Sequence, residues 1–90
     1  MTNSNKPIRN PQIMMQQLYD EMMLYNIQTE EVHILNPTAK LIWELSDGTH
    51  TIKQITQAMQ QHFRVPSPHN LHHDIEQTVI KLANLGVLRV

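Results

Sequence analysis

The chain has 90 residues, 40% of them hydrophobic and 17% charged, which is the composition of one small globular domain with a modest core. Its formal net charge of −1 does not favour binding to nucleic acid or to an anionic membrane surface. The sequence contains no cysteine, which excludes a disulfide framework, a thiolate metal site and a cysteine nucleophile.

The first twelve residues are polar and contain Pro7 and Pro11. They predict a flexible N-terminal tail over residues 1–12, followed by a single domain over residues 13–90. This segment has no apolar stretch of the kind that directs secretion, and no window of the chain approaches the roughly 18 apolar residues of a membrane span. We therefore expect a cytoplasmic protein that does not interact with membranes.

The first part of the domain predicts a small antiparallel sheet. Residues 22–26 and 32–35 are short apolar runs joined by a polar turn, which is typical of a hairpin. Residues 13–18 are a further run, but they are rich in Met and Gln, which are poor strand formers, so a helical turn is an alternative there. If this run is a strand, the sheet is a three-stranded meander.

A helix is predicted over residues 37–46, directly after the last strand. Asn36 is suited to the N-cap, because its side chain can accept a hydrogen bond from a free backbone N–H, and Pro37 is suited to the first helical position. Gly48 follows the helix and can adopt the left-handed conformation of a C-terminal cap. We expect Trp43 to lie in the core, because its helical neighbours are apolar, with an exposed binding anchor as the alternative.

Two more helices are predicted after residue 50. Thr51 and Gln54 form a capping-box pattern at the start of the second helix. Ser67 and Pro68 are suited to the N-cap and the first position of the third helix. Gly86 is a candidate cap at its end, before an extended segment over residues 87–90. The third helix carries one apolar stripe at helical spacing, made of Leu71, Ile75, Val79, Leu82 and Leu85.

Strands followed by three short helices predict an α+β domain, with the helices on one face of a small antiparallel sheet of two or three strands. The last two helices could form a helix-turn-helix-like pair, which raises DNA binding as an alternative function. However, Lys81 of the third helix is accompanied by Asp74 and Glu76, so that helix is not electropositive.

The histidines raise the possibility of a metal site. His69, His72 and His73 lie near the start of the third helix beside Asp74, at spacings that can share a helix face. A solvated polar helix start is the simpler interpretation, so we expect neither a metal nor a cofactor. Catalytic patterns such as a Ser/His/Asp spacing or a glycine-rich phosphate loop are not found. We therefore expect no catalytic residues and no enzymatic activity.

Three sequence elements resemble a known family. They are Leu35-Asn36-Pro37-Thr38-Ala39, Ile42-Trp43-Glu44-Leu45 and Asp47-Gly48-x-x-Thr51. They are similar to the PqqD-like proteins, also called RiPP recognition elements, and the resemblance covers about residues 20–90. It implies a small winged-helix-like domain, active in natural product biosynthesis, that binds the leader segment of a precursor peptide and presents it to a modifying enzyme.

The resemblance also implies where the peptide binds. It places the peptide along the strand over residues 31–36, with the third helix as the other wall of a groove. An extended peptide can add to the free edge of a sheet, while pockets beside the edge select its side chains. The predicted peptide-binding residues are Val32, His33, Ile34, Leu35, Asp74, Ile75, Thr78, Val79 and Leu82. Strand alternation means that half of the strand residues face the core, and the sequence does not say which half.

The expected partners follow from the same resemblance. They are a precursor (leader) peptide and a separate modifying enzyme, either a radical-SAM enzyme or another peptide-modifying enzyme. Two alternatives stay open. The first is a scaffold that pairs its sheet edge with a second copy and forms a homodimer, and the second is a winged-helix DNA-binding protein.

Overall fold

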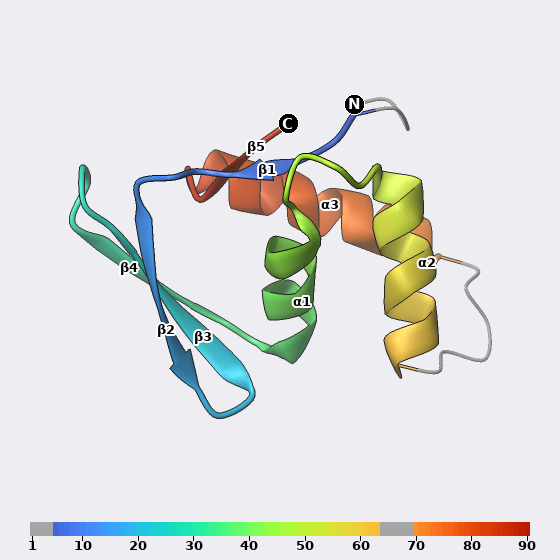
Figure 1. Cartoon of the computed structure of the whole chain (residues 1–90), viewed down its shortest axis with the longest axis horizontal. Coiled ribbons are helices and arrows are strands. Elements are labelled where there is room, and N and C mark those ends of the chain that lie inside the picture. The colour runs from blue at the N-terminus through green and yellow to red at the C-terminus, as the bar shows by residue number, and fades with distance from the viewer. Residues whose placement is uncertain (1–4, 64–69) are drawn as a thin grey trace.

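The computed structural model describes residues 5–63 and 70–90, in which a three-stranded antiparallel sheet is followed by three helices (Figure 1). The sheet has the strand order β2-β3-β4, formed by Ile13–Leu18, Glu21–Asn26 and Glu31–Leu35. The helices are α1 (Pro37–Leu45), α2 (Ile52–Phe63) and α3 (Leu71–Asn84). A second, two-stranded sheet pairs β1 (Ile8–Arg9) with β5 (Leu88–Arg89). The predicted α+β class, with the sheet before the helices, is confirmed.

The Met- and Gln-rich run over residues 13–18 is a strand. β2 pairs with β3 along its whole length, from Ile13 opposite Asn26 to Leu18 opposite Glu21. Cross-strand pairing therefore outweighs the low strand propensity of Met and Gln. The register also aligns Leu24 of β3 with His33 of β4, which completes the three-stranded meander.

The two faces of the meander have different surroundings, because successive side chains of a strand point to opposite faces. Met22, Leu24 and Leu35 are buried on the inner face, where they join the core. On the opposite face, Val32 and Ile34 are 54% and 52% exposed. We call this opposite side the outer face; its residues are Met14, Gln16, Leu18, Glu21, Met23, Tyr25, Val32 and Ile34.

The helix starts agree with the predicted capping residues where the structure describes them. The Asn36 side chain accepts a hydrogen bond from the Ala39 backbone N–H at 2.8 Å. At the start of α2, the Thr51 N–H donates to Gln54 Oε1 at 2.8 Å, and the Gln54 N–H donates to Thr51 Oγ1 at 3.1 Å. The capping box is thus formed in both directions. The third helix differs: α3 begins at Leu71 with Asn70 at the N-cap position, three residues after the predicted cap, whereas Ser67 and Pro68 themselves lie outside the described residues.

The core lies between the inner face of the sheet and the three helices. Ile75, Val79 and Leu82 of α3 are buried, as the apolar stripe predicted, and Leu71 and Leu85 pack against them. The predicted core position of Trp43 is also confirmed. Its side chain is 4% exposed, and its indole N–H donates to the Val87 carbonyl at 3.1 Å.

The N-terminal segment differs from the prediction. Pro7 is buried, and β1 aligns Ile8 with Arg89 and Arg9 with Leu88. Figure 1 shows β1 and β5 side by side, near the two ends of the chain. The tail predicted over residues 1–12 is therefore too long, because residues 7–10 belong to the fold; residues 1–4 lie outside the described residues. A strand of two residues that pairs with the far end of the chain has too little local pattern to be found from sequence.

Among the described residues, every helix is too short or too polar to cross a membrane.

Candidate functional site

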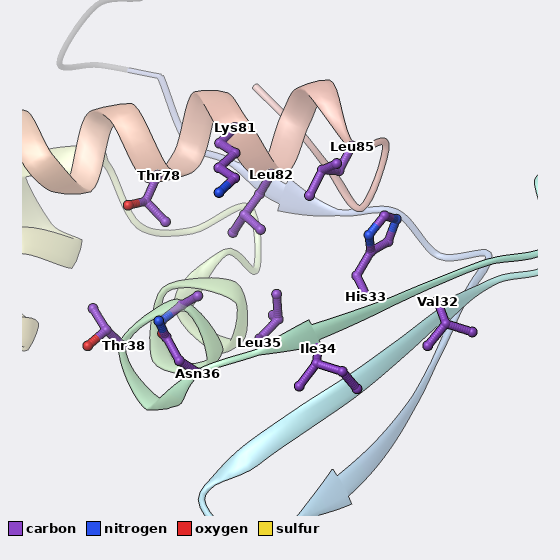
Figure 2. A pocket seen from close by; sticks show the side chains of 11 residues that line it. Val32, His33, Ile34, Leu35, Asn36, Thr38, Thr78, Lys81, Leu82 and Leu85 are labelled. Carbon is purple, nitrogen blue, oxygen red and sulfur yellow. The ribbon is translucent and has the colours of Figure 1, made fainter.

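A groove of about 430 Å³ lies between β4 and α3 (Figure 2). Three elements line it: the last residues of β4, the first turn of α1 and the C-terminal half of α3. The lining residues are Val32, His33, Ile34, Leu35, Asn36, Thr38, Ala39, Thr78, Lys81, Leu82 and Leu85. The groove therefore follows the strand-to-helix corner that the Asn36-Pro37 cap creates.

One wall of the groove is an edge strand. Among the described residues, β4 pairs with β3 and with no other strand. Its free edge carries backbone N–H and C=O groups without strand partners, and such an edge can accept a further strand. Figure 2 shows this edge facing α3 across the groove.

The side chains of β4 contribute to different parts of the groove. Leu35 is buried and belongs to both the core and the groove, whereas Val32 and Ile34 are exposed on the outer face. His33 is half-buried on the inner face, opposite Leu24 of β3. The structure thereby answers which half of the strand faces inward: it is His33 and Leu35.

The opposite wall is one stripe of α3 together with its C-cap residue, Leu85. Thr78, Lys81, Leu82 and Leu85 follow the i, i+3, i+4, i+7 spacing that places side chains on one helix face. Leu82 is buried and shared with the core, while Thr78 is half-buried. The Thr78 hydroxyl donates to the Asp74 carbonyl at 3.0 Å, so its oxygen can still accept a hydrogen bond from a ligand.

The structure brings most of the predicted site residues together. The residues that line the groove are Val32, His33, Ile34, Leu35, Thr78 and Leu82. Ile75 and Val79 do not line it and are buried in the core, with 2% and 0% exposure. Asp74 is exposed on α3, one turn before Thr78, and it does not line the groove either. That the lining residues contact a peptide stays a prediction.

Sequence reasoning missed five lining residues. Lys81 and Leu85 lie at i+3 and i+7 from Thr78, so helical spacing could have identified them once Thr78 was chosen. The other three are Asn36, Thr38 and Ala39, at the start of α1. Their position depends on the direction in which α1 leaves the sheet, which local sequence does not encode.

The groove is rich in hydrogen-bond donors and contains no acidic residue among its lining side chains. Lys81 supplies an ammonium group on the α3 side. Asn36 uses its side-chain oxygen for the cap of α1, so its amide nitrogen is still available as a donor. The Nε2 atom of His33 is buried and has no hydrogen-bond partner within the described residues.

The alternative of a metal site gains no support from the described residues, where no group of three or more His, Cys, Asp or Glu side chains is placed to hold an ion. His72 Nδ1 lies 3.5 Å from the Thr56 hydroxyl, whereas His69 lies outside the described residues.

A polar cluster does occur between α1 and α2. Hydrogen bonds from the Thr49 hydroxyl and backbone N–H, together with the bond to the His50 ring, hold the pKa of Asp47 well below its ordinary value of 3.8. These bonds close the turn that follows α1, and we assign the cluster a structural role.

Two solved structures have the same fold. One is TbiB1 in complex with the TbiA(beta) leader peptide. It is 21% identical, with a TM-score of 0.80, and the match covers 91% of this chain and 94% of that one. The other is lasso peptide synthetase B1 complexed with the leader peptide. It is 24% identical, with a TM-score of 0.80, and the match covers 94% of this chain and 99% of that one. No curated protein matches the chain in sequence.

The sequence also matches a family profile, that of coenzyme PQQ synthesis protein D (PqqD), over residues 21–88. The matched segment runs from the first residue of β3 into β5, so it includes the whole lining of the groove. The profile thus covers most of the chain, and the similarity suggested by the Asn-Pro-Thr-Ala and Ile-Trp-Glu-Leu elements is confirmed. The chain belongs to the PqqD family.

Proposed function

We propose that this domain is a non-enzymatic adaptor that captures the leader segment of a ribosomally made precursor peptide and presents it to a separate modifying enzyme. The observation that carries the proposal is the groove, which combines a free strand edge with a helical wall. Two proteins of the same fold are described as complexes with a leader peptide, which supports the same use of the fold in this chain.

The proposed mechanism is strand addition. An extended leader segment lies along the free edge of β4 and extends the sheet to four strands, with hydrogen bonds between the two main chains. Alternate peptide side chains point to opposite faces of the sheet. Those on the inner side enter the groove beside Leu82 and Leu85, while those on the outer side lie next to Val32 and Ile34. The main chain supplies affinity, and the groove supplies selectivity.

The domain itself then carries out no chemistry. Its contribution is to raise the effective concentration of the precursor at the modifying enzyme, because a tethered substrate meets its catalyst in an intramolecular encounter. The outer face offers a surface for that enzyme, since Val32 and Ile34 are about half exposed there. A bound leader would extend this face by one strand. The enzyme would be a radical-SAM enzyme or another peptide-modifying enzyme.

The proposal is tested by filling the groove. Thr78 lines the groove and is not part of the buried core, so Thr78→Trp places a large side chain where the peptide is expected. The probe is a fluorescent synthetic leader peptide from a precursor encoded beside the gene of this chain, and its binding is followed by fluorescence anisotropy. We expect Thr78→Trp to weaken binding at least about tenfold, because a blocked groove removes the inner side-chain contacts.

Gln77→Trp is the matched control. Gln77 is exposed on α3 and does not line the groove, so the same side chain is added to the same helix outside the site. Circular dichroism melting shows whether both variants are folded. Equal affinity of the two folded variants for the leader would contradict the proposed site.

Self-association is a second candidate function, and the exposed outer face next to a free strand edge favours it. In that case two copies pair through β4 or through the outer face, and no leader peptide is needed. Sedimentation equilibrium over a hundredfold concentration range separates the two candidates. A monomer that binds the leader supports the adaptor, whereas a dimer that Ile34→Lys dissociates and that ignores the leader supports the scaffold.

A further inference from the structure

Lys81 brings a positive charge into the groove and has no ion-pair partner in the part of the chain that the structure describes. Figure 2 shows its side chain pointing from α3 towards the groove. Helix neighbours at i±3 and i±4 are the side chains that usually pair with a lysine, and here they are Gln77, Thr78, Asn84 and Leu85, none of which is acidic. The ion pair within the described residues joins Asp47 and His50, so Lys81 is not part of it.

The start of α1 adds positive potential at the same groove. Asn36, Thr38 and Ala39 line the groove, so the N-terminal end of this nine-residue helix borders it. Backbone dipoles make a helix N-terminus favourable for negative charge. The first turn of α1 has no acidic residue that would offset this potential.

A third observation points to a polar ligand. His33 Nε2 is a buried ring nitrogen without a hydrogen-bond partner in the described part of the chain. Buried polar atoms in folded proteins are almost always hydrogen-bonded, so an orphaned one calls for an explanation. His33 lines the groove, so this unpaired nitrogen lies within the wall of the site, and a rotation of the ring would expose it to a bound polar group.

Among the described residues, no side-chain carboxylate lines the groove to offset these features. Glu31 precedes the lining residues of β4, and Asp74 lies one turn before Thr78 on α3. Both are exposed, and neither is among the lining residues. The lining of the groove therefore has hydrogen-bond donors on two walls and no acidic side chain.

We propose that the groove selects peptide strands that carry a side-chain carboxylate at one fixed position, and that Lys81 is the residue that recognises it. This inference rests on the proposed function and adds the chemical class of the ligand. The Asp or Glu of the bound strand lies between the Lys81 ammonium and the start of α1, where a charge-assisted hydrogen bond forms. Strand addition fixes the register, so a single peptide position meets Lys81.

The test is a selection from a library of random twelve-residue peptides. Each peptide is displayed with fixed sequence on both sides, so that the only carboxylates in the random segment are side chains. The wild-type domain is compared with Lys81→Glu and with Lys53→Glu. Lys53 is exposed on α2 and outside the groove, so the control makes the same change of charge elsewhere.

We expect Asp and Glu to be enriched at one position by the wild type and by Lys53→Glu. Lys81→Glu is expected to lose this enrichment and to favour Lys or Arg at the same position. For a single selected peptide, replacing the acidic residue by its amide is expected to weaken binding to the wild type about two- to fivefold, as for a solvent-accessible ion pair. The same replacement is expected to leave binding to Lys81→Gln unchanged.

The outcomes separate this inference from the proposed function. Enriched peptides without an acidic position, or an acidic position that Lys81→Glu retains, would overturn the inference while leaving peptide binding in place. A selection that enriches no peptide at all would overturn the proposed function and this inference together.

Discussion

Replacing Trp43 tests how the far ends of the fold are held together. The indole N–H donates to the Val87 carbonyl, the Asn10 N–H donates to the same oxygen, and the Arg9 guanidinium lies 5.4 Å from the ring centre. Trp43→Phe removes the first bond but does not orphan the carbonyl, because Asn10 still donates to it. One lost hydrogen bond and the smaller ring each cost about 1 kcal/mol, giving about 2 kcal/mol in all. For a domain of this size, that lowers Tm by about 10 °C.

The assay is thermal denaturation followed by circular dichroism. Trp43 is the only tryptophan, so global replacement of tryptophan by β-(3-benzothienyl)alanine changes this site alone. That residue keeps the ring shape and lacks the N–H, so we expect it to lower Tm by about half as much as Trp43→Phe. If Trp43→Phe melts within about 2 °C of the wild type, the assigned roles of the hydrogen bond and of the ring packing are refuted.

Three further predictions concern stability. Asn36→Ala removes the cap of α1 and should lower the free energy of unfolding by about 1 kcal/mol, whereas Asn36→Asp should retain most of it; urea denaturation measures both. The Thr49 hydroxyl and N–H depress the pKa of Asp47 in the folded state. The ionised Asp47 therefore stabilises the fold fully at pH values above its ordinary pKa of 3.8, and this stabilisation is lost as the pH falls from there through the lower pKa of the folded state. The midpoint of urea denaturation should therefore fall less steeply with decreasing pH in Asp47→Asn than in the wild type. Equal slopes in the two proteins would contradict this. Gly86 and Gly48 have φ of 80° and 83°, so alanine at either should destabilise by about 1 kcal/mol. Calorimetry should find the larger loss at Gly48, where a Cβ would meet a neighbouring side chain at 3.1 Å.

The elements that sequence predicts well are those with local signals. The Asn36-Pro37 start of α1 and the Thr51–Gln54 capping box depend on residues within one turn of each other, and both caps form as predicted. The apolar stripe of α3 is also a local pattern, because its period is that of the helix itself.

The elements that sequence predicts poorly depend on distant pairing. β1 is two residues long and pairs with β5 at the other end of the chain, so no local pattern marks it. Residues 13–18 form a strand because β3 is beside them along their whole length, despite the low strand propensity of Met and Gln. In both cases tertiary contacts decide the structure.

The candidate site was predictable only in part, because it also depends on how distant elements pack against each other. The periodicity of α3 identifies one apolar stripe, but not the angle at which α3 faces β4. Ile75 and Val79 consequently lie in the core, while Lys81 and Leu85 lie in the groove. Leu82 occupies the border between the two, which is why it is both buried and a lining residue.

The most direct test of the central claim is an NMR titration of the ¹⁵N-labelled domain with an unlabelled leader peptide encoded beside its gene. The account predicts amide shift changes at residues 31–36 and 78–85, together with nuclear Overhauser contacts between the peptide backbone and the free edge of β4. Those contacts would establish strand addition. If the peptide changes none of these amides, while the amides of β4 broaden as the concentration of the domain rises, the edge serves self-association and the adaptor account is contradicted.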